Sequence, residues 1–515
     1  MTPDLFGAPS GGSFPPPRAF QDVAHRELRA GVLAGHQRQL VMAPTGAGKT
    51  YLALRVCHEA IQRGKRVMFI CDRTTLIEQT IAVARSYGMQ TPGVIQAQHP
   101  MFASWRPFQI ASAQTLARRG APGAFDVIVV DEAHTLYGTT TKLVESTTAA
   151  VIGLSATPFT KGLGAIYSRL VNAATMDELV RLGVLTPLRV RECVRPDMTD
   201  AKTSGGEWTQ REAGDRGKVL VGDVVTEWLA HASERKTIIF GPTVDYAEAL
   251  AARFRDVGVR AEVFTSHTTD VERAALLEDY RRPDARIRIL ISVEALAKGF
   301  DVPDVSCVVD ARPLRKSLST YIQMVGRGLR SAPGKSECLL IDHSGNARRF
   351  AADFQTVYFD GLAELDAGER LDREVRPEVE DDDVSQCPSC GHSPMARRCI
   401  ACGFQPTRTP LIEHQVGESR EVQLLGDGAS GLASSRRELY AMIRQHEHER
   451  AQRKAAEGKP EGNPEGSASH RYREIVGAWP AGLWKSDPLT PYTPAVRNKL
   501  KSMAIAWAKR NGGRR

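Results

Sequence analysis

The stretch that decides the fold is Ala43-Pro-Thr-Gly-Ala-Gly-Lys-Thr50, which follows the apolar run Gln39-Leu-Val-Met and precedes Tyr51-Leu-Ala-Leu-Arg-Val. A strand, a glycine turn and the start of a helix form the context of a phosphate-binding loop, because backbone N–H groups and the helix dipole favour an anion there. Ala43 stands where the general pattern has its first glycine, so a purely structural glycine turn is the alternative. The predicted phosphate-binding residues are Thr45, Gly46, Ala47, Gly48, Lys49 and Thr50. Within this set, Lys49 would reach the β- and γ-phosphates and Thr50 would ligate Mg²⁺.

Short β-branched runs alternate with helical stretches around this loop and again farther along the chain. Before residue 187 the runs are 39–42, 66–70, 109–112, 126–130 and 150–154. A second series lies at 236–240, 261–264, 286–291, 306–310 and 337–342. Such alternation predicts βαβ units around parallel sheets that are buried on both faces. We therefore predict an α/β protein with two tandem parallel-sheet domains.

A pair of adjacent carboxylates ends another apolar run, in Val127-Ile-Val-Val-Asp-Glu-Ala-His134. At the carboxyl end of a parallel strand beside the loop, Asp131 could hold the Mg²⁺ shell and Glu132 could polarise the water that attacks a γ-phosphate. Taken alone, Asp-Glu after a strand is more often a solvated turn. The loop and the carboxylates together favour a nucleoside triphosphate site.

The composition of the 515-residue chain is that of an ordinary soluble protein, with 42% hydrophobic and 25% charged residues. No run approaches the roughly 18 apolar residues that a membrane span needs, and the Gly-, Ser- and Pro-rich start does not resemble a signal peptide. We expect a cytoplasmic protein with no membrane partner. The net charge of +8 is concentrated in residues 434–515, which hold 17 Lys and Arg against 8 Asp and Glu. This basic end suggests a polyanionic partner, although a solvated helical face is the alternative.

From Arg18 to Asp342 the motifs resemble, in order, those of superfamily two helicases of the DEAH-box kind. Arg18-Ala-Phe-Gln21 resembles the element that reads adenine, with Gln21 as its amide, and Ser155-Ala-Thr157 resembles the motif that couples hydrolysis to movement. The resemblance assigns coupling to Ser155, Ala156 and Thr157. It implies two RecA-like domains, with ATP and Mg²⁺ as cofactors and ATP hydrolysis coupled to movement on nucleic acid.

Further segments resemble the family's elements for nucleic acid and ribose. Ile70-Cys-Asp-Arg-Thr-Thr-Leu-Ile-Glu-Gln79, Ala111-Ser-Ala-Gln-Thr-Leu116 and Ile239-Phe-Gly-Pro-Thr243 match its backbone-contacting motifs. Lys298-Gly-Phe-Asp301 resembles the element whose Asp reaches the ribose, with Lys298 where an Arg is frequent. The implied nucleic-acid contacts are Arg73, Gln114, Thr115, Thr243 and Ser292, and the implied ribose contact is Asp301.

The most discriminating match is Gln323-Met-Val-Gly-Arg-Gly-Leu-Arg330, which begins with Gln where related branches have His. Arginines three positions apart on a helix share a face, so Arg327 and Arg330 would both point into a cleft and neutralise charge on the γ-phosphoryl group. With Gln323, they are the catalytic candidates of the second domain. ATP would complete its site only when the cleft between the domains closes, and hydrolysis would reopen it.

Four of the nine cysteines fall within sixteen residues, as Cys387, Cys390, Cys399 and Cys402, in two Cys-x-x-Cys knuckles that are each followed by glycine. Four thiolates at this spacing can close a tetrahedron around one structural Zn²⁺. A redox pair is the alternative for a single knuckle, and a Cys₃His set that uses His392 stays open. We expect His392 to be a surface bystander and the scattered cysteines to be buried thiols.

A helicase core followed by such a ribbon and a basic region is similar to the RadD family of bacterial DNA-repair helicases and to related phage helicases. The similarity is specific in Gly326-Arg-Gly-Leu-Arg330-Ser-Ala-Pro-Gly-Lys335 and in Cys338-Leu-Leu-Ile-Asp342-His-Ser-Gly-Asn346. It implies single-stranded or branched DNA as partner, repair or recombination proteins bound through the ribbon or tail, and a nucleoid-associated location. An RNA helicase is the first alternative. The others are the motor subunit of a restriction-type complex and a DNA-binding scaffold with little unwinding.

The composition shifts predict seven segments. In chain order they are a disordered tail at 1–17, RecA-like domains at 18–187 and 188–360, an acidic linker at 361–386, the zinc ribbon at 387–404, a linker at 405–433 and a basic, mostly helical region at 434–515. Trp479, Trp484 and Trp507 lie among cations in the last segment. They could stack on bases, but we expect them to form the core of a small helical domain.

Overall fold

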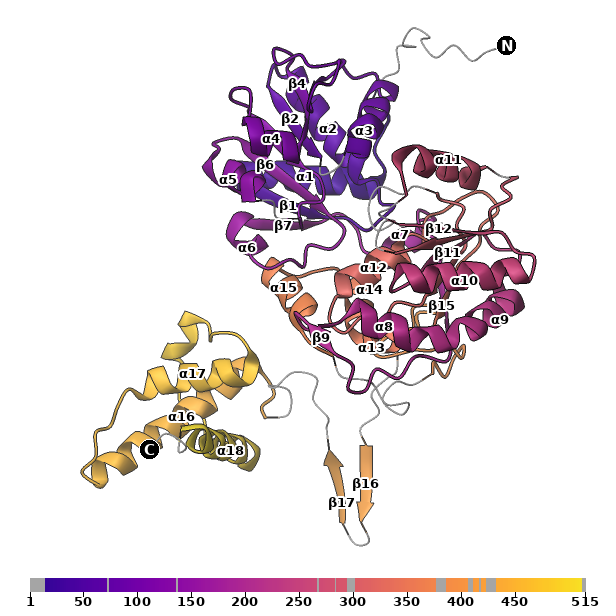
Figure 1. The fold of residues 1–515 in the computed structure, drawn as a ribbon. Helices are drawn as coiled ribbons and strands as arrows, with labels where there is room; N and C mark the ends of the chain where they lie inside the picture. The colour runs from indigo at the N-terminus through magenta and orange to yellow at the C-terminus, as the bar shows by residue number, and fades with distance from the viewer. Residues whose placement is uncertain are drawn as a thin grey trace, which may run out of the picture. The chain divides into compact units, whose positions relative to one another are not determined.

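The computed structural model describes residues 14–71, 74–135, 138–265, 268–282, 284–293, 302–376, 386–405, 411–415, 418–422 and 432–511. The chain divides into two compact units, Met1–Pro406 and Thr407–Arg515. The first unit contains two parallel sheets (Figure 1). The fold class predicted from the sequence, α/β with two tandem parallel-sheet domains, is confirmed.

The first sheet has seven parallel strands in the order β3-β4-β2-β5-β6-β1-β7. Its central strands are buried along almost their whole length, as the β-branched runs predict for a sheet covered on both faces. The edge strands β3 and β7 were not predicted, because each is short. The strands are β1 (Arg38–Met42), β2 (Val67–Cys71), β3 (Gly93–Ile95), β4 (Phe108–Ser112), β5 (Val127–Val130), β6 (Ala150–Ser155) and β7 (Arg169–Asn172).

Helices connect the strands of the first sheet and cover it. β1 lies between β6 and β7, so the turn that leaves β1 for α2 opens at the carboxyl edge, next to the end of β6. This topology brings the phosphate-binding loop beside the segments that follow β5 and β6. The helices are α1 (Ala19–Leu33), α2 (Lys49–Gln62), α3 (Thr74–Ser86), α4 (Ala113–Arg119), α5 (Gly138–Ser146), α6 (Leu163–Ile166) and α7 (Met176–Arg181).

The second sheet has six parallel strands in the order β12-β13-β11-β14-β15-β8. Its edge strand β8 alternates buried and exposed residues because arginines occupy every second position, and the sequence did not predict it. A two-stranded hairpin of β9 (Thr203–Ser204) and β10 (Glu207–Trp208) follows β8. The strands are β8 (Leu188–Glu192), β11 (Thr237–Phe240), β12 (Ala261–Phe264), β13 (Ile289–Ser292), β14 (Cys307–Asp310) and β15 (Cys338–Asp342).

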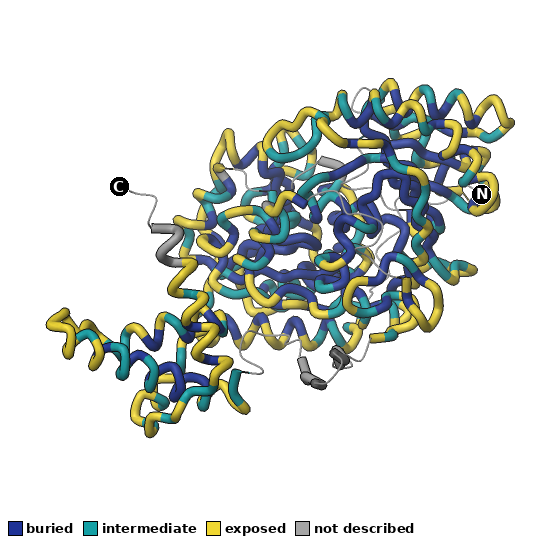
Figure 2. The backbone as a smooth tube through the Cα atoms, turned by 90° about the horizontal axis from the view of Figure 1, so that it is seen from below, coloured by how far each residue is buried: buried dark blue, intermediate teal, exposed yellow. Residues whose placement is uncertain are grey.

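The second sheet is likewise surrounded by helices. Figure 2 shows the strands of the first unit mostly as buried backbone and the outer turns of the helices as exposed. One apolar cluster includes Leu185 of the first domain and Ile322 and Leu329 of the second, so the two domains share part of their core. The helices are α8 (Gln210–Gly217), η1 (Lys218–Leu220), α9 (Val221–Ala232), α10 (Val244–Asp256), α11 (Asp270–Arg281), α12 (Leu318–Gly326), α13 (Asn346–Arg349) and α14 (Ala351–Asp360).

The segment predicted as an acidic linker contains a helix, α15 (Leu365–Arg373), which contacts both domains (Figure 1). On the first domain, Leu365 joins the apolar cluster beneath α6, and Glu369 accepts a hydrogen bond from the N–H of Gly162 at 3.3 Å. On the second domain, Asp372 accepts from the N–H and Oγ of Ser319 at 2.9 and 3.1 Å. Because Ser319 lies in the first turn of α12, α15 bridges the first domain and the start of that helix.

The second unit is built from helices around a small apolar core. Tyr440, Ile443, Tyr472 and Leu500 lie in this core, and Trp484 packs against it. By contrast, Trp479 is 52% exposed, so it does not belong to the core that we expected all three tryptophans to form, and the Trp507 side chain lies outside the described residues. The elements are α16 (Arg436–Ala456), α17 (Pro464–Val476), η4 (Gly482–Ser486) and α18 (Pro494–Asn511), and a hairpin of β16 (Leu411–Gln415) and β17 (Glu418–Val422) precedes them. None of the described helices of the chain is both long enough and apolar enough to cross a membrane.

Candidate active site and metal centre

The predicted phosphate-binding loop connects β1 to the first turn of α2. Gly46 and Gly48 have φ angles of 92° and 85°, a left-handed conformation that side chains other than glycine disfavour. Gly48 is the residue before α2 begins at Lys49. The N–H groups at the start of α2 have no partners within the helix, so they can bind an anion that sits above the loop.

Gln21 supports this loop from α1. Its side chain is 4% exposed, its Nε2 donates to the carbonyl of Ala47 at 3.2 Å, and its Oε1 accepts from the N–H of Arg18 at 3.0 Å. A Cβ added at Gly48 would lie 2.7 Å from Nε2 of Gln21, so the glycine is also required by this close contact. The structure thus gives Gln21 a role in holding the loop, and adenine recognition by Gln21 stays a prediction.

Lys49 is partly buried near the two carboxylates that follow β5. Burial lowers the pKa of Lys49, whereas the negative charges of Glu132 and Asp131 raise it and Arg330 and Arg327 lower it further. The lysine Nζ lies 3.5 Å from the carbonyl oxygen of Ala43. An ammonium group held in this environment gains strongly from a bound phosphate.

Glu132 has a strained backbone. Its φ angle is 48°, an uncommon conformation for a residue with a side chain. Its N–H donates to Oδ1 of the neighbouring Asp131 at 3.0 Å. Such conformations cost about 1–3 kcal/mol and cluster at active sites, which supports the predicted catalytic role of this carboxylate.

A chain of polar contacts runs from Glu132 to the second domain. Nδ1 of His134 lies 3.2 Å from Oε2 of Glu132 and 2.9 Å from Oγ of Ser155. Ser155 Oγ accepts from the N–H of Thr157 at 3.0 Å, and Thr157 Oγ1 accepts from Nε2 of Gln323 at 2.9 Å. Ala156, the third predicted coupling residue, lies between Ser155 and Thr157 in the sequence and is buried. His134 was not predicted to take part in the site, although it follows Asp131 by only three residues in the same motif.

Arg327 and Arg330 do not lie on a helix, contrary to our prediction, because α12 ends at Gly326. Gly326 and Gly328 break the helix and allow close packing: a Cβ at Gly328 would lie 2.4 Å from Sγ of Cys338. Both arginines nevertheless reach the same cavity, Arg327 with only 7% exposure. Burial lowers the pKa of Arg330, which would favour contact with an anion.

This cavity, of about 420 Å³, is shared by the two domains. The first domain contributes Lys49, Asp131 and Glu132, and the second contributes the two arginines. The residues that line the cavity are Arg18, Thr45, Gly46, Gly48, Lys49, Thr50, Leu76, Gln79, Asp131, Glu132, Val184, Pro303, Arg327, Arg330 and Ser331. Five of them were not predicted to belong to this site. Among those five, Leu76 and Gln79 come from α3, Val184 from the segment after α7, Pro303 from the segment before β14, and Ser331 from the segment after Arg330. Thr50 and Asp131 lie together in the cavity, as a shared Mg²⁺ would require.

The two domains approach each other closely at the cavity. A Cβ at Gly326 would lie 3.2 Å from Cβ of Thr45, and a Cβ at Gly46 would lie 3.3 Å from Cγ of Arg330. The N–H of Thr186 donates to the carbonyl of Leu329 at 2.7 Å. The segment after α7 therefore pairs with the extended end of the turn that carries Arg327 and Arg330, which we call the arginine turn.

The residues predicted to contact nucleic acid differ in how far their side chains are exposed to solvent. Gln114 is exposed and accepts from Ser112 Oγ at 2.8 Å, while Thr115 is buried and accepts from the N–H of Ala97 at 3.2 Å. Thr243 accepts from the N–H of Tyr246 at 3.2 Å at the start of α10, and Ser292 is 0% exposed. Thr115 and Ser292 thus do not present their side chains to solvent in this structure. Arg73 and the 298–301 motif with Asp301 lie outside the described residues.

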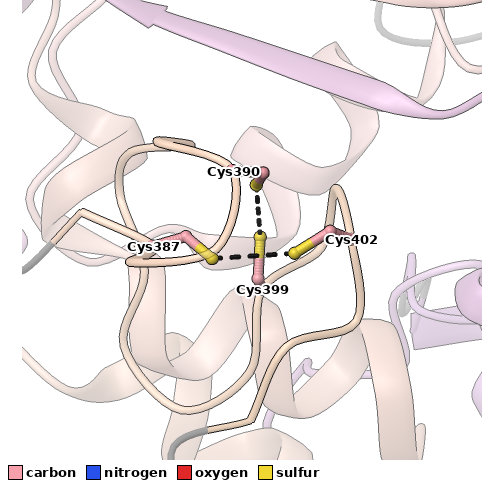
Figure 3. A group of neighbouring side chains, drawn as sticks. All are labelled: Cys387, Cys390, Cys399 and Cys402. Atoms are coloured by element: carbon pink, nitrogen blue, oxygen red, sulfur yellow. Dashed lines mark hydrogen bonds between the residues drawn. The ribbon is translucent and has the colours of Figure 1, made fainter.

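The four clustered cysteines point their sulfurs at a common centre (Figure 3). All four sulfurs lie within 4.8 Å of one another, and the pairs Cys387–Cys402 and Cys390–Cys399 are each 3.6 Å apart. A tetrahedron with Zn–S bonds of about 2.3 Å has edges of about 3.8 Å, so this cluster fits Zn²⁺. His392 is not part of the set, and it is buried rather than the surface bystander we expected.

Each knuckle is a tight turn closed by backbone hydrogen bonds. Gly391 and Gly403 have φ angles of 72° and 74°, and their N–H groups donate to the carbonyls of Cys387 and Cys399 at 2.8 and 2.9 Å. The glycine after each knuckle therefore supplies the left-handed residue that this turn needs.

The ribbon is docked on the second domain. Oε1 of the buried Gln355, on α14, accepts from the N–H groups of Ala396, Arg397 and Arg398 at 3.2, 2.8 and 3.2 Å. Ser393 Oγ donates to Glu192 of β8 at 2.7 Å. A single amide oxygen thus holds three consecutive ribbon N–H groups against the second domain.

Comparisons with known proteins agree with this geometry. A family model described as the res subunit of type III restriction enzymes matches residues 15–160, and one described as the helicase conserved C-terminal domain matches residues 221–332. The matches fall in order on the first and second sheet domains. Together they cover about half of the chain.

Individual relatives are distant. The 51.5 kDa protein of a Lactococcus phage is 26% identical over 318 residues, covering 60% of this chain and 66% of that protein. The IRC3 protein of Saccharomyces cerevisiae, named as an ATP-dependent helicase, is 22% identical over 361 residues, covering 65% of this chain and 52% of that protein. The chain thus spans between about half and two thirds of the length of these curated relatives.

A solved structure shares the fold. The fragment of a type I restriction enzyme HsdR subunit from Vibrio vulnificus matches with a TM-score of 0.54 and 22% identity, covering 68% of this chain and 67% of that one. The two family matches, the helicase relatives and the paired sheets with their shared cavity lead to one assignment. The chain belongs to superfamily two of the helicases, of the DEAD/DEAH type.

Proposed function

We propose that this chain is an ATP-driven motor that translocates along or unwinds single-stranded or branched DNA in repair or recombination. The observation that carries the proposal is the cavity in which Lys49, Asp131 and Glu132 of the first domain face Arg327 and Arg330 of the second. Because both domains supply this site, the nucleotide state controls their separation. Two domains that each grip a strand would then move along it once per cycle.

The residues divide the chemistry among them. ATP with Mg²⁺ supplies the phosphoryl group that is transferred to water. Thr50 and Asp131 would hold the metal, and Lys49 would bind the β- and γ-phosphates. Glu132 would orient the attacking water and accept its proton. Arg327 and Arg330 would stabilise the charge that develops on the transferred group.

ATP turnover measured with single-stranded DNA, forked DNA and RNA tests this proposal. We expect DNA to stimulate the wild-type chain far more than RNA does. Equal stimulation by RNA would refute the DNA assignment and favour an RNA helicase. A chain without any nucleic-acid-dependent turnover would refute the motor itself and leave a binding scaffold.

Substitutions in the cavity, compared with substitutions at exposed residues, test whether the cavity is the site of ATP hydrolysis. Lys49→Ala and Arg327→Ala should each lower turnover at least 100-fold, because each removes a charge that contacts the phosphates. Lys65→Ala and Arg253→Ala are matched controls, since their side chains are 55% and 64% exposed away from the cavity. Full activity in Arg327→Ala would contradict a site shared by two domains.

A restriction-type motor is the second candidate, favoured by the family model that matches residues 15–160 and by the HsdR structure. Such a motor would translocate duplex DNA without separating its strands. Displacement of a triplex-forming strand from a duplex, without unwinding of a forked substrate, would favour this candidate over the helicase.

We further propose that the basic second unit adds affinity for DNA while the first unit hydrolyses ATP. Truncation after Leu432 removes the residues that carry the excess positive charge. ATP hydrolysis should survive, while DNA affinity should fall and become less dependent on salt because fewer phosphates are neutralised. An unchanged salt dependence would refute the assignment of DNA binding to this unit.

A further inference from the structure

Lys335, in the segment between α12 and β15, is bound to three backbone carbonyls. Its Nζ donates to Gly328 and Arg330 at 2.6 Å each and to Pro303 at 3.1 Å. A lysine ammonium has three N–H donors and no acceptor. The geometry therefore uses the full hydrogen-bonding capacity of this side chain.

The three carbonyls belong to two segments that line the nucleotide cavity. Gly328 and Arg330 form the turn of the catalytic arginines, and Pro303 follows the predicted ribose-binding motif. Lys335 is not itself among the residues that line the cavity. It therefore acts on the site through the backbone of the residues that do.

The arginine turn depends on such backbone contacts. It lies beyond the end of α12, where the N–H groups of Arg327 and Gly328 still donate back to Met324 and Val325 at 3.2 and 3.0 Å. Gly328 has no side chain to pack, and the space where its Cβ would lie is filled by Cys338 and Val308. In addition, the carbonyls of Gly328 and Arg330 are directed at the partly buried ammonium group of Lys335.

We propose that Lys335 is a positioning residue for ATP hydrolysis, which ties the arginine turn to the segment at Pro303 so that Arg327 and Arg330 meet the γ-phosphate. This inference rests on the proposed function, because it presumes that the arginines act on ATP. A neutral residue at 335 would leave three carbonyls without a donor and would release the turn. Binding of the β- and γ-phosphates by Lys49 and the loop would persist.

The proposal predicts that kcat depends on pH in a characteristic way. The pKa of Lys335 is lowered to about 8, chiefly by burial, which outweighs the opposing effect of Cys338 and Asp304; Arg330 also lowers it. Above pH 8 the ammonium therefore loses a proton and one of its three donors. We expect kcat to fall as the pH rises through about 8. Because the pKa of Lys49 is also lowered, kcat must be measured at saturating ATP, where the phosphates keep Lys49 charged.

The experiment compares the DNA-stimulated ATP hydrolysis of full-length wild type, Lys335→Arg and Lys335→Met, with Lys218→Met as the control. Lys218 lies in the same domain and its side chain is 41% exposed. Lys335→Met should lower kcat about 10- to 100-fold with KM for ATP changed less than about threefold. Lys335→Arg, which stays charged at all these pH values, should recover most of kcat at pH 7.5 and lose the alkaline fall.

Several results would overturn the inference. These are an unchanged kcat in Lys335→Met, an equal loss in Lys218→Met, or an alkaline limb that is the same in wild type and Lys335→Arg. If thermal denaturation shows that Lys335→Met is unfolded, the pH profiles of wild type and Lys335→Arg decide. A wild-type chain that does not hydrolyse ATP refutes the proposed function itself, which is a different outcome from active wild type with indifferent Lys335 variants.

Discussion

Gln323 on α12 donates its Nε2–H to Oγ1 of Thr157, 2.9 Å away, and this bond joins the second sheet domain to the first. Thr157 is in turn connected through Ser155 and His134 to the carboxylate of Glu132. The bond therefore lies on a continuous polar path between the predicted catalytic carboxylate and the helix that precedes the arginine turn.

Gln323→Ala and Thr157→Val should each lower DNA-stimulated kcat about tenfold, which corresponds to about 1.4 kcal/mol. Because both remove the same bond, the double variant should be no worse than either single one, and the double-mutant cycle should give a coupling of about 1.4 kcal/mol, the full cost of one single variant. Turnover at saturating ATP and DNA is the measurement. Thr226→Val, whose hydroxyl donates only to Gly222 of its own helix, is the control. Losses that add in the double variant would mean that the two residues act separately.

Replacement of Cys387 and Cys390 by serine should abolish metal binding. Metal content by elemental analysis should fall from about one zinc per chain to near zero, since a tetrahedral site cannot close on two thiolates. Cys193→Ser is the control, because Cys193 is a free thiol outside the cluster. Stoichiometric zinc in the double variant would show that the cluster is not the zinc site.

Gln355→Leu should loosen the ribbon without touching a cysteine. It removes the acceptor of three N–H groups, and buried unsatisfied donors cost about 1–3 kcal/mol each. We expect zinc to be released to a chelator faster and the thermal unfolding temperature to fall. Thr226→Val, which loses a hydroxyl bonded within its own helix α9, should behave like wild type. Wild-type zinc release from Gln355→Leu would show that the docking is dispensable for the metal site.

Trp479→Ala should weaken the binding of single-stranded DNA. The indole is 52% exposed and lies between His470, 5.0 Å away by ring centroids, and the guanidinium carbon of Arg473, 4.7 Å from its ring centroid, so an exposed aromatic ring beside a cation can contact a base. Stacking of a base on an aromatic side chain contributes about 1–3 kcal/mol, so affinity by fluorescence anisotropy should fall at least fivefold. Trp105→Ala is the matched control, because Trp105 is 77% exposed in the first unit. Equal effects of the two substitutions would remove the special role of Trp479.

The active site was predictable wherever a motif is local. The loop at 43–50 and the carboxylates at 131–132 follow buried β-branched strands, and both signals are contained in about eight residues. Topology then brings them together at one edge of the sheet, as parallel strands require. His134 belonged to the same motif, but its contacts depend on Ser155, which lies on another strand.

Other features needed tertiary information. The spacing of Arg327 and Arg330 suggested a helix face, but Gly326 and Gly328 end the helix, and the arginines meet in the cavity from a turn. Thr115 looked like a surface contact, yet its hydroxyl is used within the domain. The helix α15 was hidden because its acidic composition resembles a linker, while its few apolar residues are buried only against another domain.

The grip of α15 on both domains has a mechanical consequence. Leu365 is anchored in the interior of the first domain, and Asp372 is bonded to the first turn of α12 in the second. The two anchors lie within a single short helix, so the cleft cannot widen beyond the reach of that helix unless one anchor lets go. In the proposed motor, the distance advanced per ATP would therefore be limited by this helix as well as by the nucleotide, because α15 itself sets the separation of the two anchors.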